Sequence, residues 1–237
     1  MTTIRTHART AGLLYLAVAV TGGFSLLYLP SLIAAGDPAT TAANVRANEP
    51  FFRLAVLSGL VCQVIFVFLA LALYRLFKEV SEPHAKTMVA LVVAAVPVAF
   101  LNTLNQLAAL QVLTGADYLN AFGTDGRLAL ATFLLELHGQ GLVVVGLFWG
   151  LWLLPLGLLV IRSRFMPRGI GVLLIAACIG YVLDVVVRLL SPGMAAIVAP
   201  VAAASKFGEL VIIAWLLFGR VDAPLTTALR PGFMRLD

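Results

Sequence analysis

The stretch from Leu128 to Ile161, LALATFLLELHGQGLVVVGLFWGLWLLPLGLLVI, decides the fold class. Its only ionisable side chains are Glu136 and His138. As one helix it would measure roughly 50 Å at 1.5 Å per residue, whereas about 20 apolar residues suffice to cross a hydrocarbon core of roughly 30 Å. The stretch therefore predicts a membrane-spanning helix that either protrudes from the bilayer or kinks near its glycines or Pro155.

The whole chain has the composition of an integral membrane protein. Hydrophobic residues make up 62% and charged residues 11% of its 237 positions, against about half and a quarter in soluble proteins. Barrel strands would alternate over about ten residues, but the apolar runs here are long and continuous. We therefore expect an all-α, polytopic bundle of six transmembrane helices, at residues 11–34, 54–74, 87–113, 137–161, 169–187 and 197–218.

Lys and Arg residues favour one side of this bundle, as they do in cytoplasmic loops. With the N-terminus inside, the inner segments hold Arg5, Arg9, Arg75, Lys78, Lys86, Arg162, Arg164, Arg168, Arg220, Arg230 and Arg235. The outer segments hold Arg46, Arg53, Arg127 and Arg188. We expect a multi-pass protein of the plasma membrane with both termini cytoplasmic, residues 1–10 and 219–237 forming tails around the membrane domain 11–218. The net charge of +5 is spread over the inner segments, which favours contact with lipid head groups over nucleic acid.

The residues that enzymes and metal sites need are scarce in this chain. Cys62 and Cys178 are the only cysteines, too few for a disulfide framework or a four-cysteine zinc site. One membrane histidine, His138, cannot supply a three-histidine zinc site or a bis-histidine haem. Neither Gly-x-Ser-x-Gly nor His-Glu-x-x-His occurs in the sequence. We therefore expect no catalytic residue, no metal and no cofactor.

A short helix is predicted between the first two spans. Asp37 has the side chain of a helix N-cap, and Pro38 suits the first helical position because its missing N–H has no helical partner there. We expect a helix from Pro38 to about Asn48, outside the membrane.

Three segments resemble a known bacterial family. They are RTAGLLYL at 9–16, TAANVRANEPFFR at 41–53, and FWGLWLLPLGLLVIRSRFMPRGIGVLLIAACIGYVLD at 148–184. In these segments the chain is similar to the bacterial integral membrane proteins of domain of unknown function 4386. The resemblance covers nearly the whole chain and implies a membrane-helix architecture and no particular activity. Trp152 stands where the family pattern leads us to expect a histidine.

Polar side chains within the predicted spans mark the candidate site. A charged side chain at the centre of a span costs about 2.5–3.5 kcal/mol on insertion scales, so such residues usually face the bundle interior. Counting 1.5 Å per residue from the flanking cations puts these groups in the middle and outer half of the bundle. The candidates for binding a ligand or a proton are Asn102, Gln106, Glu136, His138, Asp184, Arg188, Lys206 and Glu209.

Glu136 and His138 are not expected to act as a local dyad. Residues two apart on a helix point about 200° away from each other. Since Glu136 has no cation within a turn of its own helix, we expect it to pair with Arg188 or Lys206 from another helix.

Two alternatives to that cross-helix pairing remain open. Asp184 with Arg188, and Lys206 with Glu209, can neutralise each other on their own helices, which makes them structural pairs. Counted together, the polar layer holds three carboxylates and two fixed cations. A buried site tolerates an unpaired charge poorly, so we expect either that one carboxyl group stays protonated or that His138 carries the compensating proton near neutral pH.

Three classes of function are compatible with these patterns. The first is a transporter-like or receptor-like protein whose polar cavity binds a small polar ligand, an ion or a proton. The second is a non-enzymatic partner that assembles with, or regulates, another membrane protein. The third, an intramembrane enzyme acting on a lipid or peptide, has the weakest sequence support.

Overall fold

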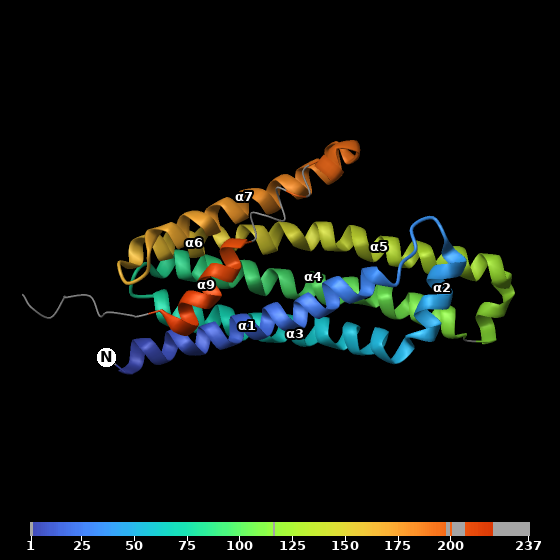
Figure 1. Ribbon diagram of the computed structural model, residues 1–237, viewed down its shortest axis with the longest axis horizontal. Helices are drawn as coiled ribbons and strands as arrows, with labels where there is room; N and C mark the ends of the chain where they lie inside the picture. Colours follow the sequence, from blue (N-terminus) through green and yellow to red (C-terminus); the bar gives the residue numbers. More distant parts are fainter. Residues whose placement is uncertain (1, 116, 198–199, 201–206, 220–237) are drawn as a thin grey trace, which may run out of the picture.

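Every regular element is a helix in the computed structural model, which describes residues 2–115, 117–197, 200 and 207–219 (Figure 1). The long helices are α1 (Thr2–Ser31), α3 (Glu49–Phe77), α4 (Glu82–Thr114), α5 (Gly123–Leu151) and α7 (Arg168–Leu190). The shorter elements are α2 (Pro38–Ala47), η1 (Asp117–Phe122), α6 (Leu153–Ser163), η2 (Pro192–Met194) and α9 (Phe207–Phe218). The predicted all-α class is confirmed.

Among the described residues, five helical segments are long and apolar enough to cross a membrane. They are Ile4–Ser31, Glu49–Phe77, Glu82–Thr114, Asp117–Ser163 and Arg168–Leu190. Each overlaps one of the first five predicted spans. The sixth predicted span, 197–218, is described only in part, and its described helix, α9, is shorter.

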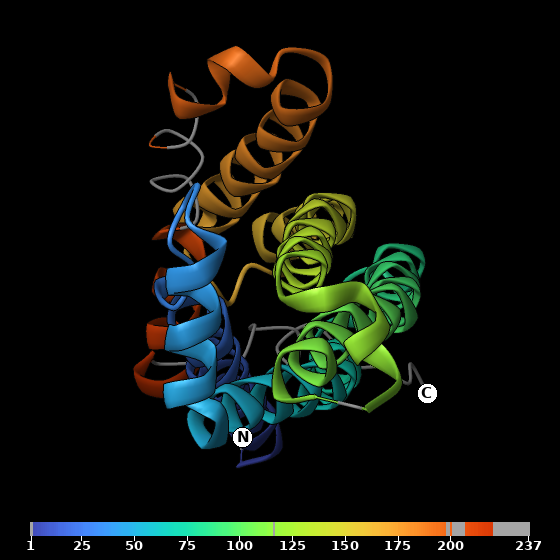
Figure 2. The ribbon, with the colours of Figure 1, turned by 90° about the vertical axis from the view of Figure 1, so that its right-hand side faces the viewer.

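The long helices pack in a ring, seen along its axis in Figure 2. Helix α1 packs against α3, α3 against α4, α4 against α5, and α5 against α7. Helix α9 packs against both α7 and α1 and so joins the two ends of this series. Both views show α7 leaning away from α5 toward the C-terminal end of α7.

The predicted kink in the 128–161 stretch occurs at Trp152. Helix α5 runs unbroken through its glycines and ends at Leu151, after which α6 begins. Pro155 supplies the cause, because it has no N–H and its ring conflicts with the carbonyl four residues earlier, that of Leu151. The break turns α6 inward, where Leu156 and Leu159 are completely buried.

Helix α6 lies in an apolar cluster that we call the basal core. It joins α6 to five other helices through fully buried side chains, including Leu69, Leu73, Met88, Leu156, Leu159, Leu174 and Ile212. Close contacts of glycines bring α6 and α7 together. A Cβ on Gly171 would lie 2.5 Å from the carbonyl oxygen of Gly157. The basal core is therefore packed by backbone as well as by side chains.

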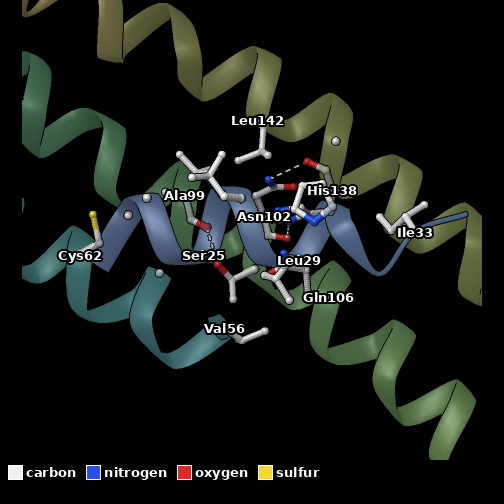
Figure 3. A pocket seen from close by; sticks show the side chains of 18 of the residues that line it. Ser25, Leu29, Ile33, Val56, Cys62, Ala99, Asn102, Gln106, His138 and Leu142 are labelled. Atoms are coloured by element: carbon white, nitrogen blue, oxygen red, sulfur yellow. Dashed lines mark hydrogen bonds between the residues drawn. The ribbon is translucent and has the colours of Figure 1, made fainter. Parts of the chain in front are cut away.

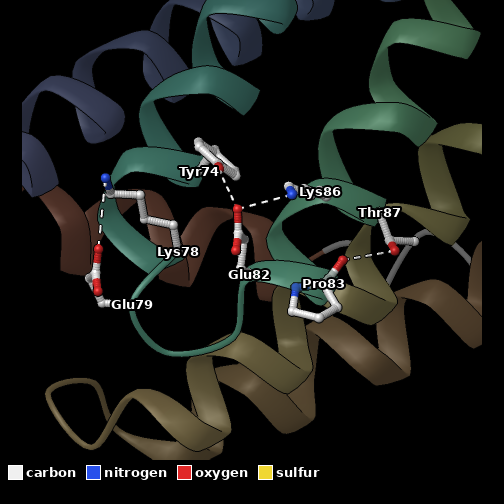
Figure 4. Close-up of polar contacts among 7 residues, drawn as sticks. All are labelled: Tyr74, Lys78, Glu79, Glu82, Pro83, Lys86 and Thr87. Atoms are coloured by element: carbon white, nitrogen blue, oxygen red, sulfur yellow. Dashed lines mark hydrogen bonds and ion pairs between the residues drawn. The ribbon is translucent and has the colours of Figure 1, made fainter.

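Helix α6, which the basal core surrounds, lies toward the end of the bundle that we call the basic end (Figure 1). This end holds the start of α1 and the α3–α4 and α6–α7 turns, with Arg5, Arg9, Arg75, Lys78, Lys86, Arg162, Arg164 and Arg168. At the α3–α4 turn Lys86 pairs with Glu82 at 3.0 Å and Lys78 with Glu79 at 3.7 Å (Figure 4). These pairs are exposed, so they add little stability.

Helix α2 lies at the opposite end, which we call the far end (Figure 1). As predicted, the Asp37 carboxylate caps it by accepting a hydrogen bond of 2.9 Å from the Thr40 N–H. The Thr40 hydroxyl also donates to this carboxylate, and these hydrogen bonds lower the pKa of Asp37. Glu49–Pro50, which follows α2, begins α3.

Candidate functional site

A cavity of about 1190 Å³ lies inside the ring of helices. Its lining comes from α1, α3, α4, α5 and α9, with Tyr181 from α7, Trp152 at the α5–α6 break, and the segment from Ile33 through the first turn of α2. Most of the lining side chains are apolar, including Leu26, Leu29, Val56, Phe66, Leu142 and Ile213. Ligand pockets usually measure about 300–1,000 Å³, so this cavity has room for a drug-sized molecule.

Buried polar side chains gather on the wall of this cavity. In the described part of the chain they are Thr41, Gln63, Asn102, Gln106 and Ser163, and all except Ser163 line the cavity. Burying an amide is unfavourable unless it is hydrogen-bonded. The polar side chains that are unfavourable to bury therefore lie mainly around this one cavity.

The α4 wall and the α5 wall are joined by Asn102 and His138, which face each other in Figure 3. The Asn102 Nδ2 donates to the His138 carbonyl oxygen at 2.9 Å. In return, the His138 Nδ1 lies 3.1 Å from the Asn102 carbonyl oxygen. Gly141 permits this approach, since a Cβ there would lie 2.0 Å from the Asn102 Oδ1. The two helices are thus fixed in register by one reciprocal contact.

The contact with Asn102 also determines the tautomer of His138. A carbonyl oxygen can only accept a hydrogen bond, so the Nδ1 of His138 must carry the proton. In a neutral ring the Nε2 then keeps a free lone pair. His138 is half-buried in the cavity wall and offers that nitrogen as an acceptor.

Gln63 on α3 contributes a second acceptor to the wall. It is 8% exposed, and its Oε1 has no hydrogen-bond partner among the described residues. An unsatisfied buried acceptor of this kind costs about 1–3 kcal/mol. Small residues bring the α1 and α3 walls close beside it: a Cβ on Gly22 would lie 2.9 Å from the Cys62 sulfur.

Glu209 lies where the cavity meets the basal core, which we call the cavity floor. The hydroxyl of Tyr15 donates to the Glu209 Oε2 at 2.8 Å, and that of Tyr181 donates to the Oε1 at 3.2 Å. Trp152 is 2% exposed and lies 5.7 Å from Tyr15 and 4.9 Å from Phe66, ring centre to ring centre. Three helices therefore hold one carboxylate in a surrounding rich in aromatic rings.

The structure brings most of the predicted site residues to this cavity. Asn102, Gln106, Glu136, His138 and Glu209 all line it. Lys206 lies outside the described residues. Asp184 and Arg188 lie away from the cavity lining.

Asp184 and Arg188 pair with each other on α7, at 2.9 Å between the Arg188 Nε and the Asp184 Oδ1. Of the two predicted arrangements for Arg188, pairing within α7 is therefore the one that occurs. Arg188 pairs with Asp184 and not with Glu136. No ion pair in the described part of the chain includes Glu136, whose side chain is exposed. The partner that the structure gives His138 is a carbonyl group, not a carboxylate.

Glu136 and His138 both reach the cavity, although they do not share a face of α5. Leu135, Gly139 and Leu142 mark the middle of the cavity-facing side. At 100° per residue Glu136 and His138 lie on its two opposite flanks. This explains how a single helix presents both residues to one space.

Sequence reasoning missed several residues of the site. Gln63 carried a usable signal, because an isolated amide in an apolar span needs a partner. Tyr15 and Tyr181 carried none, since tyrosines in spans commonly lie at membrane interfaces. Only the meeting of α1, α7 and α9 assigns their hydroxyls to Glu209.

Metal binding finds no support within the described residues, where no group of three or more His, Cys, Asp and Glu side chains is placed to hold an ion.

The site lies entirely within a recognisable family domain. The family model for a domain of unknown function, DUF4386, matches residues 10–219 and so covers every cavity-lining residue. No curated protein and no solved structure matches the chain. The resemblance carried by the segments at 9–16, 41–53 and 148–184 is therefore confirmed, and the chain belongs to the DUF4386 family.

Proposed function

We propose that this protein binds a small amphipathic molecule in the cavity inside its helix ring, as a transporter or receptor does. The observation that carries the proposal is the gathering of buried polar side chains on the wall of an otherwise apolar cavity. Binding pockets share this pattern, with mainly apolar lining and a few polar groups that fix orientation.

Structural packing alone accounts poorly for this distribution. Polar residues that only join helices place their hydrogen bonds between neighbouring helices, as Asn102 does with His138. Gln63 differs, because its Oε1 is buried with no partner in the described part of the chain. A ligand with a hydrogen-bond donor would satisfy it.

The apolar lining favours an amphipathic ligand over the small polar molecule, ion or proton expected from the sequence. A small polar molecule, an ion or a proton would leave Leu26, Leu29, Val56 and Leu142 in contact with empty space or water. A molecule with an apolar body fills that volume and reaches the polar wall with one end. Such molecules partition into the bilayer, which would supply the ligand.

Two variants test the binding proposal without disturbing helix packing. A Cβ on Gly23, which lines the cavity, meets no atom within 4 Å, and the same is true of Gly169, which lies away from it. Gly23→Phe should fill the cavity, whereas Gly169→Phe should leave it open. Native mass spectrometry of protein purified from its host membrane should find a small molecule on the wild type and on Gly169→Phe, and lose it on Gly23→Phe.

A wild-type protein that carries no small molecule in repeated preparations would contradict the proposal. So would a molecule retained equally by both variants, because it would then sit elsewhere on the surface. If the molecule were replaced by a co-purifying membrane protein lost on Gly23→Phe, the assembly-partner alternative would take its place.

For the membrane arrangement we propose six spans in the plasma membrane, with the basic end and both termini in the cytoplasm. The support is the concentration of Lys and Arg residues at that end, including Arg75, Lys86 and Arg168. Reporter fusions after Gly115 and after Arg164 should report the outside and the inside respectively. The reverse pattern would overturn this orientation.

A further inference from the structure

We infer that the ligand of this cavity is a lipid alcohol, an uncharged molecule with a large apolar body whose hydroxyl pairs with the amides of Gln63 and Gln106. The inference rests on the proposed function and names the chemical class of its ligand. Three features of the described residues carry it: two buried amides without a protein partner, the free acceptor of His138, and the apolar volume on both sides of these groups.

Gln63 on α3 and Gln106 on α4 are buried with unused amides. Their side chains are 8% and 5% exposed, and both line the cavity. Neither amide makes a hydrogen bond among the described residues. Asn102, one turn before Gln106 on the same wall, differs because its amide bonds the His138 carbonyl (Figure 3). Burying an amide without a partner is unfavourable, so these two glutamines are placed to bind a ligand and not to join helices.

The unused groups of the wall include both donors and acceptors. A glutamine amide has two N–H donors and a carbonyl acceptor. The Gln63 Oε1 has no partner in the described part of the chain, and the His138 Nε2 keeps a lone pair in the neutral ring. A hydroxyl group both donates and accepts. It therefore satisfies a glutamine amide in either orientation, and it can also donate to His138.

Other common head groups match this wall less well. A carboxylate only accepts hydrogen bonds, so it would leave the Gln63 Oε1 and the His138 Nε2 without a donor. An ether or an ester has the same deficiency. An ammonium group only donates, so it would leave the N–H groups of both amides without an acceptor. A hydroxyl is the simplest group that uses the donors and the acceptors together.

The two amides lie within the apolar space and not at one end of it. Counted at 1.5 Å per residue from the α3–α4 turn, Gln63 lies roughly 22 Å and Gln106 roughly 36 Å along the bundle. Apolar lining continues beyond them, with Phe66 and Ile213 toward the basal core and Ile33 toward the far end. A small water-soluble alcohol would leave this volume unfilled. A long-chain or polycyclic alcohol fills it and brings a hydroxyl to one amide, or a diol to both.

The test uses the full-length protein in nanodiscs, with empty nanodiscs as the background. Tritiated dodecan-1-ol is the probe, and the competitors are unlabelled dodecan-1-ol, 1-methoxyundecane, dodecylammonium and dodecanoate, which have similar lengths. We expect the alcohol to displace the probe at least tenfold more effectively than the ether, and more effectively than either ion.

Leucine variants remove the two amides and keep an apolar side chain of similar reach. Gln63→Leu combined with Gln106→Leu should lower the preference for alcohol over ether at least fivefold, and the single variants show which amide contributes more. Gln140→Leu, at an exposed position of α5 outside the cavity lining, is the matched control and should change the preference less than twofold. Without added probe the double variant should melt no lower than the wild type, since neither amide has a partner among the residues described.

The outcomes separate this inference from the proposed function. If the ether or either ion displaces the probe as well as the alcohol does, the cavity binds amphipathic molecules but the hydroxyl assignment is wrong. A double variant that keeps the preference, or that melts well below the wild type, also overturns the assignment, because the amides would then serve helix packing. If unlabelled dodecan-1-ol does not displace the probe, or if Gly23→Phe leaves probe binding unaffected, the proposed function itself fails.

Discussion

One continuous stretch of sequence, residues 128–161, passes through both halves of the bundle, and the two halves differ in what fills their interior. In the half toward the basic end, α6 occupies the interior, and the basal core is closed by side chains such as Leu156 and Leu159. In the half toward the far end, no described helix takes the place of α6, and the interior is a cavity with a polar wall. The break at Trp152 divides the stretch into a wall helix, α5, and a filling helix, α6.

This difference between the two halves shows where the chain can bury polar side chains. Ser163 is the only buried polar residue among those described that lies away from the cavity. In a solid core a polar side chain must find a protein partner, whereas beside a cavity a ligand or water can provide one. Substitutions in the basal core should therefore act on stability, and substitutions at the cavity mainly on occupancy.

The largest expected effect is the loss of packing in the basal core. Leu156 is completely buried, whereas Leu142 is half-buried and borders the cavity. Leu156→Ala should lower the free energy of unfolding by about 2–3 kcal/mol. This is at the low end of the range for cores, because on unfolding the Leu156 side chain becomes exposed to lipid and not to water. Leu142→Ala should cost less than half as much. Titration with sodium dodecyl sulfate in mixed micelles measures both, and equal losses would remove the distinction between the halves.

A smaller effect is expected where α6 and α7 touch. A Cβ on Gly171 would lie 2.5 Å from the Gly157 carbonyl oxygen, and backbone cannot rotate out of the way. Gly171→Ala should destabilise the protein by about 1–3 kcal/mol. Gly169→Ala, two residues earlier on the same helix and free of neighbours within 4 Å, is the matched control and should be neutral or slightly stabilising. The same titration compares them; an unchanged Gly171→Ala protein would mean that the helices separate freely here.

Where α4 crosses α5 beside the cavity, a crowded and an uncrowded glycine can again be compared. A Cβ on Gly141 would collide with the Asn102 side chain, while one on Gly139 meets no atom within 4 Å. Since a side chain can rotate, Gly141→Ala should cost about 1 kcal/mol, less than Gly171→Ala. It should also release the His138 carbonyl from its hydrogen bond, which a changed chemical shift of labelled Asn102 would report. A Gly139→Ala protein with the same shift change would show that the effect does not come from this contact.

The smallest effect is expected at the cap of α2. The pKa of Asp37 is lowered in the folded protein by the hydroxyl and N–H of Thr40, so its charged form stabilises the fold above the unfolded pKa of about 3.9. That stabilisation is lost as the pH falls through the lower, folded pKa. Asp37→Asn should melt slightly below wild type at pH 6, and the difference should be smaller at pH 3, below the unfolded pKa. A constant difference at both pH values would assign the effect to shape and not charge.

The sequence predicted the architecture well because hydrophobic runs and helix signals are local. The five described long spans, the Asp37–Pro38 helix start and the interruption before Pro155 all depend on residues within a few turns of each other. The pairing of Asp184 with Arg188 was one of two alternatives, and the local one occurs.

The site was harder to predict, because its contacts join residues far apart in the chain. Tyr15 and Glu209 are separated by 194 positions, and nothing in either neighbourhood indicates the other. Asn102 and His138 were chosen as candidates, but their reciprocal use of backbone carbonyls depends on the closeness that Gly141 allows. Composition indicates which residues are costly to bury, and only the packing of helices assigns their partners.

The contact between Asn102 and Gly141 has an evolutionary consequence. Because the Asn102 side chain occupies the space where a Cβ at 141 would lie, a substitution at 141 forces the Asn102 side chain to move, and the two positions are coupled. A family member with alanine or serine at 141 should carry a smaller residue, such as glycine or alanine, at 102, and would lose the amide that holds the His138 carbonyl. Correlated substitution of this pair across DUF4386 sequences would therefore separate lineages that keep the α4–α5 register from lineages that have replaced it.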